Sequence, residues 1–294
     1  MNLRNLRLVV LGSVLVSFSC AAFAAGGAAH PEMVVSAQWL ADHLNDPKVV
    51  VLHVADKRSD YARGHIPGAR FLSTDDFIEG DVAELPPPDK LKAVFEKLGV
   101  SDDTRVVIYT TAWYPNAGRA YYTLDYIGHG DKTSLLDGGI EHWSLEKRPI
   151  STETPAAKAG KLTVQVHPEV RAMLDEIKKD AEPNGNELLL DSRPTRGYTG
   201  GHIAGATSLY WQDTLVDPKD DPVFLAPEKL KALFEARGAK AGRKIVTYCV
   251  VGLQASHNYF LAKYLGYDAA MYDGSMHEWS MVNNLPLVKG DAPR

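Results

Sequence analysis

An internal repeat of long period divides this chain of 294 residues into two similar halves. Gly64-His65-Ile66-Pro67-Gly68-Ala69 returns in the second half as Gly201-His202-Ile203-Ala204-Gly205-Ala206. Three other segments return in the same order and at nearly the same offset: Pro88–Glu96 as Pro227–Glu235, Arg105–Tyr109 as Lys244–Tyr248, and Leu136–Gly139 with Trp143 as Tyr272–Ser275 with Trp279. Solenoid repeats are only about 20 to 50 residues long. The repeat therefore predicts two duplicated domains.

Strands and helices are expected to alternate within each copy. The expected strands are short apolar runs at Val49–Val54, Val106–Tyr109, Leu188–Leu190 and Lys244–Tyr248. The expected helices are Ser36–Leu44, Lys90–Leu98 and Ala117–Ile127 in the first copy, and Pro168–Lys178, Glu228–Ala236 and Gln254–Leu265 in the second. Such alternation is typical of a parallel sheet with helices on both faces. The fold class is therefore predicted as α/β, with two domains of this kind.

The N-terminus resembles a targeting segment and is not expected to belong to the fold. Arg4 and Arg7 precede an apolar run, Leu8–Phe18, and Ala22-Phe23-Ala24 supplies a small-x-small cleavage site. This is the layout of a secretory signal peptide. The apolar run is shorter than the roughly 20 residues that span a bilayer. We predict a signal peptide at residues 1–24 and a periplasmic or secreted protein, with lipidation of Cys20 as the alternative.

A linker is expected between the two copies. Residues 148–160 contain two prolines and an Ala/Thr/Ser-rich run without apolar periodicity. The N-terminal domain is therefore assigned to residues 32–148, the linker to 149–163 and the C-terminal domain to 164–289. The formal net charge of −5 comes without a long basic tract, which argues against nucleic acid as a partner. Without a second long apolar run, no stable membrane association is expected after signal cleavage.

One cysteine stands out as a candidate nucleophile. Cleavage of the signal peptide would remove Cys20 and leave Cys249 as the only thiol, so no internal disulfide could form. Cys249 ends an apolar strand, and a helical pattern begins a few residues later. Backbone N–H groups converge at such a place and favour an anion, which predicts a pKa below the free value of roughly 8.5. The alternative is a buried structural thiol.

Taken together, these motifs resemble the rhodanese family, specifically its two-domain exported sulfurtransferases. The features that carry the resemblance are the two Gly-His-Ile motifs, the strand that ends at Cys249, and Tyr272-Asp273-Gly274-Ser275 followed by Trp279. The resemblance covers the mature chain and implies two rhodanese-like domains, an inactive first copy and a catalytic second copy. Thr110 stands in the first copy where Cys249 stands in the second. A threonine hydroxyl without an adjacent base is a poor nucleophile, so the first copy is expected to be scaffold.

The resemblance also implies a mechanism. Cys249 would attack the outer sulfur of thiosulfate, or take sulfur from 3-mercaptopyruvate, and pass it from a persulfide to a thiol or cyanide acceptor. The loop that would surround this sulfur with backbone N–H groups consists of Cys249, Val250, Val251, Gly252, Leu253 and Gln254. No cofactor is implied. No metal site is expected either, because the histidines lack zinc-site spacing and only one cysteine remains.

The loop departs from both donor classes of the family. Thiosulfate-specific members carry basic residues and 3-mercaptopyruvate-specific members carry small Gly or Ser residues, where this chain has Val250 and Val251. The donor is therefore left open. Asp191-Ser192-Arg193 matches the family's Asp-x-Arg run, and Arg196 follows closely. Either arginine is a candidate to bind the anionic donor, whereas an ion pair with Asp191 is the structural alternative for Arg193.

Two other functions can be weighed against sulfur transfer. Cysteine phosphatases and arsenate reductases need an arginine at the sixth position after the cysteine, and this chain has Ala255 there, which disfavours phosphoryl chemistry. A degenerate sulfur-binding or protein-docking module stays possible because the loop is apolar.

Several remaining residues receive structural interpretations. His65 and His202 are expected to hold turns by hydrogen bonds, and Trp143 and Trp279 to be core aromatics. The Trp113-Tyr114 loop could reach the cleft. His257 is weighed as a base, with a position on the helix surface as the favoured alternative.

Overall fold

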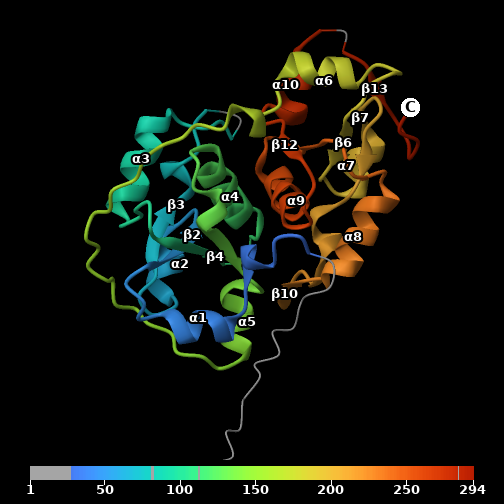
Figure 1. Ribbon diagram of the computed structural model, residues 1–294. Coiled ribbons are helices and arrows are strands. Elements are labelled where there is room, and N and C mark those ends of the chain that lie inside the picture. The colour runs from blue at the N-terminus through green and yellow to red at the C-terminus, as the bar shows by residue number, and fades with distance from the viewer. Residues whose placement is uncertain (1–27, 81–82, 112, 284) are drawn as a thin grey trace, which may run out of the picture.

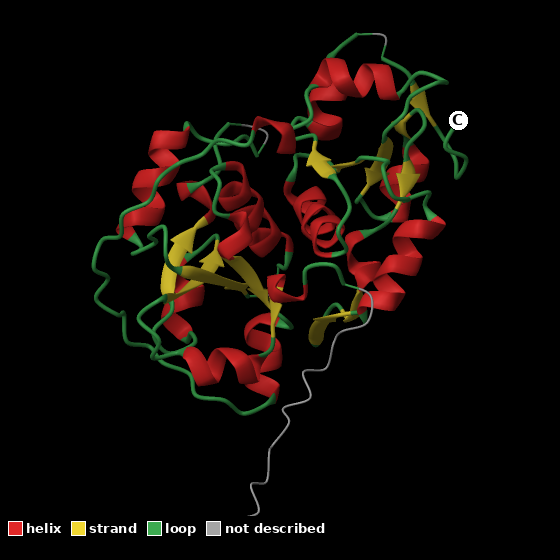
Figure 2. Cartoon of the chain, in the orientation of Figure 1, coloured by secondary structure: helices red, strands yellow, loops and turns green. Residues whose placement is uncertain are grey.

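Two α/β domains lie side by side in the computed structural model (Figure 1), which describes residues 28–80, 83–111, 113–283 and 285–294. The predicted signal peptide at 1–24, including Cys20, lies outside the described residues. No helix in the described ranges is long and apolar enough to cross a membrane. Each domain has a sheet between helices, as Figure 2 shows most clearly for the first domain. The predicted α/β fold with two such domains is confirmed.

The first domain contains a five-stranded parallel sheet of order β1-β5-β4-β2-β3. Its strands are β1 (Val34–Val35), β2 (Val49–Ala55), β3 (Arg70–Ser73), β4 (Arg105–Thr110) and β5 (Thr133–Leu136). Its helices are α1 (Ala37–His43), α2 (Arg58–Arg63), α3 (Pro88–Lys97), α4 (Pro115–Tyr126) and α5 (Gly139–Leu145), with 3₁₀ turns at Pro31–Met33, Thr74–Asp76 and Gly130–Lys132. The Ser36 side chain caps α1 by accepting a hydrogen bond from the Trp39 N–H.

The second domain repeats this plan with a four-stranded parallel sheet of order β12-β11-β6-β8. Its strands are β6 (Leu188–Asp191), β8 (Thr207–Ser208), β11 (Ile245–Tyr248) and β12 (Ala269–Met271). Two antiparallel pairs flank it: β7 (His202–Ile203) with β13 (Leu287–Val288), and β9 (Leu215–Asp217) with β10 (Asp221–Phe224). Its helices are α6 (Leu174–Asp180), α7 (Thr195–Gly200), α8 (Pro227–Ala236), α9 (Leu253–Tyr264) and α10 (Ser275–Met281), with 3₁₀ turns at Pro168–Val170 and Trp211–Thr214.

Successive side chains in a strand point to opposite faces of the sheet, so they belong to separate hydrophobic clusters. In β2, Val51 packs with Leu40 and Trp143 of α1 and α5, whereas Leu52 joins the cluster that contains α3 and α4. The second domain places α6 and α10 on one face of its sheet and α8 and α9 on the other. The cores on the α4 and α9 sides merge into one apolar cluster, because these two helices pack against each other between the sheets (Figure 1).

One expected helix is wrong. The predicted helix Pro168–Lys178 is split into the 3₁₀ turn at Pro168–Val170 and α6. Between them, Arg171 forms an isolated parallel bridge with Met271, and the Ala172 N–H donates to the Met271 carbonyl (2.9 Å). This pairing beside β12 requires extended backbone, so the helical pattern is interrupted by a partner that lies far away in the sequence.

The two Gly-His-Ile motifs have the same structure, which confirms their role in holding turns. His65 stacks on Tyr61 (3.7 Å between ring centroids) and bonds through Nε2 with the Glu153 carbonyl (2.9 Å). His202 stacks on Tyr198 (3.8 Å) and bonds with the Ala292 carbonyl (3.1 Å). Each histidine therefore links its turn to a chain segment that follows the last helix of its domain.

Trp143 and Trp279 are fully buried, as predicted for core aromatics. Their indole N–H groups donate to the carbonyls of Pro149 and Pro286, respectively. Residues 152–167, which connect the domains, contain no helix or strand.

Candidate active site

Cys249 lies at the carboxyl end of β11, directly before the short loop that leads into α9. Only 1% of its surface is exposed. The strand is a central member of its sheet, paired with β6 and β12, so the position of the cysteine is fixed by parallel ladders on both sides. Ligands of such sheets bind at the carboxyl ends of the strands.

Backbone N–H groups of the loop converge on the Cys249 sulfur. The Gly252 N–H donates to Sγ at 3.2 Å. Burial raises the pKa of the thiol, whereas the backbone N–H groups of Ala255, Val251, Gly252 and Gln254 lower it, and burial is the larger effect. The expectation that the pKa lies below its free value is therefore wrong for this structure. The N–H groups are placed as predicted, but almost complete loss of solvent outweighs them.

Gly252 permits the tight curl of this loop. It adopts φ +87°, in the left-handed region that favours glycine, directly before α9 begins at Leu253. A Cβ at this position would lie 3.1 Å from the carbonyl oxygen of Asp273. Both the backbone conformation and the neighbouring chain therefore require glycine here.

The start of α10 holds the loop from its other side. Ser275 Oγ accepts a hydrogen bond from the Cys249 N–H (3.1 Å) and donates to the Tyr272 carbonyl (2.8 Å). The N–H groups of Met276 and His277 donate to the carbonyls of Cys249 and Val250. Ser275 was not among the site residues expected from sequence, although the repeated motif at Tyr272–Ser275 marked this turn.

The other predicted loop residues differ in their exposure. Val250 is 50% exposed, whereas Val251, Leu253 and Gln254 are partly buried and Gly252 is buried. Gln254 Oε1 is buried and has no hydrogen-bond partner among the described residues. The outer surface of the loop is therefore apolar at Val250 and carries no cation.

The structure gives Arg193 the ion pair that the sequence allowed as an alternative. Its Nε and Nη2 groups donate to the Asp191 carboxylate, with an Nη2–Oδ2 distance of 2.6 Å, and Nη2 also donates to the Gly201 carbonyl. Burial acts to lower the pKa of this guanidinium, but Asp191 and, more weakly, Tyr248 and Cys249 raise it. Arg193 is thus within electrostatic reach of the cysteine.

Arg196 lies on α7 and is exposed. It forms no ion pair within the part of the chain that the structure describes. An anion-binding role for Arg193 or Arg196 stays a prediction.

His257 is buried in the interface between the domains and is not on a helix surface. Its Nε2 bonds with Thr214 Oγ1 (2.8 Å), and the Thr214 hydroxyl donates to the Trp211 carbonyl (2.6 Å). Burial lowers the pKa of His257 to about 3, so it is neutral at ordinary pH. The structure therefore assigns it to the interface core, and its predicted surface position is wrong.

Trp113 of the first domain contacts the second domain at Trp211, whereas contact of its loop with the Cys249 cleft stays a prediction. Trp113 is 38% exposed, and its ring meets Trp211 of the second domain edge to face at 5.3 Å. Thr110, at the position that matches Cys249, is buried and donates its hydroxyl to the Val54 carbonyl (2.8 Å). This hydroxyl is occupied by a structural hydrogen bond.

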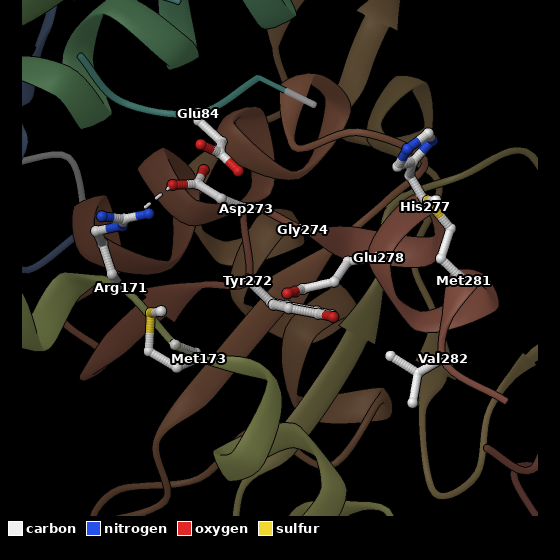
Figure 3. A pocket seen from close by; sticks show the side chains of 11 residues that line it. Glu84, Arg171, Met173, Tyr272, Asp273, Gly274, His277, Glu278, Met281 and Val282 are labelled. Carbon is white, nitrogen blue, oxygen red and sulfur yellow. Dashed lines mark ion pairs between the residues drawn. The ribbon is translucent and has the colours of Figure 1, made fainter. Parts of the chain in front are cut away.

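A hollow of about 360 Å³ opens next to the loop, between α10 and the first domain (Figure 3). Asp273 forms an ion pair with Arg171 there (3.3 Å), and Glu84 of the first domain points toward the same carboxylate. Tyr272 and Glu278 lie in the middle of the view, with Met281 toward the edge. Cys249 does not line this hollow. The hollow therefore lies beside the Cys249 loop but does not contain the thiol.

The Rhodanese-like domain family model matches two segments of the chain, residues 36–146 and 169–281. The chain belongs to the rhodanese family. It is 35% identical over 289 residues to the sulfur carrier protein TtuD of Thermus thermophilus, covering 90% of this chain and 99% of that protein. It is 29% identical over 295 residues to a thiosulfate sulfurtransferase of Corynebacterium glutamicum, covering 90% and 92%. A probable 3-mercaptopyruvate sulfurtransferase of Pseudomonas aeruginosa is 29% identical over 285 residues, covering 88% and 98%.

Solved structures have the same rhodanese fold. The crystal structure of YnjE superposes with a TM-score of 0.80 at 25% identity, over 90% of this chain and 70% of that one. The 3-mercaptopyruvate sulfurtransferase SseA from Escherichia coli gives a TM-score of 0.72 at 24% identity, over 83% and 98%. At this identity the similarity to SseA shows a shared fold only. Tandem rhodanese domains, as the sequence motifs indicate, are thereby confirmed.

Proposed function

We propose that this rhodanese-family protein is a sulfurtransferase that carries a sulfane sulfur on Cys249 as a persulfide. The observation that carries the proposal is the Cys249 sulfur itself, which accepts a hydrogen bond from the Gly252 N–H in a loop whose other N–H groups also act on it. Relatives named as thiosulfate sulfurtransferase, probable 3-mercaptopyruvate sulfurtransferase and sulfur carrier protein support sulfur transfer as the general activity.

The reaction consists of two displacements. The Cys249 thiolate attacks the outer sulfur of thiosulfate, the S–S bond of the donor breaks, and sulfite leaves with the bonding electrons. A thiol or cyanide acceptor then attacks the outer sulfur of the persulfide, whose S–S bond breaks and restores the thiolate. The loop N–H groups stabilise negative charge on the sulfur in both steps. Because burial raises the pKa of the free thiol, the thiolate fraction and the first step increase with pH.

3-Mercaptopyruvate is the second candidate donor, because the apolar loop offers little attraction to a dianion. Val250 is half exposed and brings no cation toward a thiosulfate dianion. With 3-mercaptopyruvate the C–S bond breaks, and pyruvate leaves as its enolate, which takes up a proton. Of the two candidate arginines, Arg193 is our choice for the anionic part of either donor, because its Nη1 has no hydrogen-bond partner among the described residues, whereas Arg196 lies on the exposed side of α7.

The test is sulfur transfer to cyanide from thiosulfate and from 3-mercaptopyruvate, with wild type and Cys249→Ser. Wild type is expected to form thiocyanate from at least one donor, and Cys249→Ser to form none above background. Full activity of Cys249→Ser would eliminate the persulfide mechanism. A Cys249 persulfide that forms without turnover would instead favour a sulfur-binding or docking module, since mass spectrometry after donor treatment reports the persulfide directly.

We also propose that residues 1–24 are a signal peptide and that the protein is exported. The supporting feature is the order of Arg4, Arg7, the apolar run Leu8–Phe18 and the Ala22-Phe23-Ala24 site. Expression of the full chain in a Gram-negative host, followed by fractionation and N-terminal sequencing, is expected to give periplasmic protein that begins near Ala25. Retention of Met1 in the cytoplasm would refute export.

A further inference from the structure

The first domain makes a direct hydrogen bond to the catalytic loop. The Ala83 N–H donates to the Val251 carbonyl at 3.0 Å. The same peptide unit carries the Gly252 N–H, which donates to the Cys249 sulfur at 3.2 Å. A peptide unit is planar, so fixing the direction of its carbonyl also fixes the direction of its N–H. The segment at Ala83 therefore orients one of the donors to the sulfur.

Arg119 of α4 holds this segment in place. Its Nη2 donates to the Ala83 carbonyl, and its Nη1 donates to Asp273 Oδ1 at 2.5 Å. The Arg119 side chain is 0% exposed, and its guanidinium lies 5.0 Å from the centroid of the Tyr122 ring. One buried cation thus joins the donor segment of the first domain to a carboxylate of the second.

Asp273 lies next to the loop of Cys249, so its ion pair with Arg119 brings this cation close to the loop. A Cβ built on Gly252 would lie 3.1 Å from the Asp273 carbonyl oxygen and 3.4 Å from its Oδ1. Asp273 also pairs with Arg171 (3.3 Å), which is visible as the dashed line in Figure 3. Because Asp273 is nearly buried and shared by two arginines, its carboxylate has little freedom to move. Arg119 is therefore held at both ends of its guanidinium.

We propose that Arg119 is a positioning residue for the catalytic loop, acting across the domain interface through Ala83 and the Val251–Gly252 peptide to aim the Gly252 N–H at the Cys249 sulfur. This gives the first domain, whose own Thr110 is occupied by a structural hydrogen bond, a role in the chemistry of the second. The inference rests on the proposed function for its relevance to sulfur transfer. Its physical content, the state of the Cys249 thiol, can be measured without any sulfur donor.

The experiment measures the pH midpoint for alkylation of Cys249 by iodoacetamide, with the modified residue identified by mass spectrometry. Arg119→Lys is the deciding variant, since lysine retains the positive charge beside Asp273 but lacks the planar fork that binds two acceptors at once. Loss of one aimed N–H is expected to raise the midpoint by about one pH unit, which is tenfold less thiolate at a given pH. Arg119→Met is expected to raise it at least as much.

Tyr259→Phe is the matched control. The Tyr259 hydroxyl donates to Asp125 Oδ2 at 2.5 Å, which is another buried polar contact between α9 and α4. Among the described residues its ring contacts Tyr121 and Tyr122, and no hydrogen bond joins it to the loop. Tyr259→Phe is expected to lower stability without moving the midpoint. If Arg119→Lys has the wild-type midpoint, or if Tyr259→Phe shifts it equally, the proposal is wrong. A midpoint that moves in a protein unable to transfer sulfur would retain the positioning role and reject the proposed function instead.

Discussion

Gly118 of α4 lies so close to Ser256 of α9 that a Cβ on this glycine would stand 2.9 Å from the Ser256 carbonyl oxygen. The Ser256 hydroxyl in turn donates to the Pro115 carbonyl at 3.1 Å. The two helices that join the domains therefore cross backbone to backbone at this point. The crossing brings the start of α9, and with it the loop of Cys249, against the first domain.

Gly118→Ala is expected to destabilise the protein, although alanine is the better helix former. Inserting a methyl group into a filled interface costs about 1–3 kcal/mol. Gly200→Ala is the matched control, because apart from its chain neighbours and its own helix backbone no atom of the described residues lies within 4 Å of the Cβ position, and a change there stays within about 1 kcal/mol of wild type. Urea unfolding of the three proteins measures the difference. Equal midpoints for Gly118→Ala and Gly200→Ala would contradict the close crossing.

The apolar patterns within each copy predicted its strands and helices, but they did not predict the contact between the two domains. The apolar runs that became β2, β4, β6 and β11 are recognisable because buried parallel strands are apolar on both faces. The helix α9 is buried along residues 255–262 because it packs on its own sheet and on α4 at once. Nothing in the sequence of one copy reveals this second contact. For that reason His257 was expected on a helix surface and lies in the interface.

Val250→Arg is expected to shift donor preference toward thiosulfate. Val250 is half exposed at the edge of the loop, so the new cation would remain solvated and face an incoming dianion. Attraction between unit charges at 4 Å in water is about 1 kcal/mol, which predicts roughly a five- to tenfold rise in kcat/KM for thiosulfate. Val216→Arg, at a 60% exposed position on β9, makes the same charge change elsewhere. A similar rise in both variants would assign the effect to overall charge.

The candidate site was only partly readable from sequence. Cys249 could be placed because a β-branched strand, a glycine turn and a helix follow one another in a fixed order. The direction in which the pKa of its thiol shifts could not be predicted, because it depends on how completely the folded chain buries the sulfur. Arg119 looks like any helical arginine in the sequence, and its partners Ala83 and Asp273 lie far away in the chain.

Asp137→Asn is expected to flatten the pH dependence of stability. Burial raises the pKa of Asp137 to about 6, while the Phe224 N–H and His142 act to lower it and Asp221 acts to raise it. The protonated carboxyl is therefore favoured in the folded state. The contribution of Asp137 to the free energy of unfolding is fully present below about pH 4 and is lost as the pH rises through 6. Relative to the variant, wild type should lose about 1–2 kcal/mol between these values.

Urea unfolding of wild type and Asp137→Asn at several pH values between about 4 and 7 measures this difference. The amide oxygen introduced by the substitution can still accept the hydrogen bond from the Phe224 N–H, which spans 2.9 Å in wild type, so the contact with β10 is retained. Parallel stability curves for the two proteins would show that Asp137 keeps its ordinary pKa.

The ion pair of Asp191 and Arg193 supplies the last prediction. Asp191 is fully buried and accepts from the backbone N–H, Nε and Nη2 of Arg193. Asp191→Asn leaves a buried guanidinium without its counter-charge, which costs about 3–5 kcal/mol. Arg193→Met in the same chain removes that unpaired charge, so the double variant should be more stable than Asp191→Asn alone. A double-mutant cycle by urea unfolding gives the coupling, and simple additivity of the two changes would contradict a buried pair.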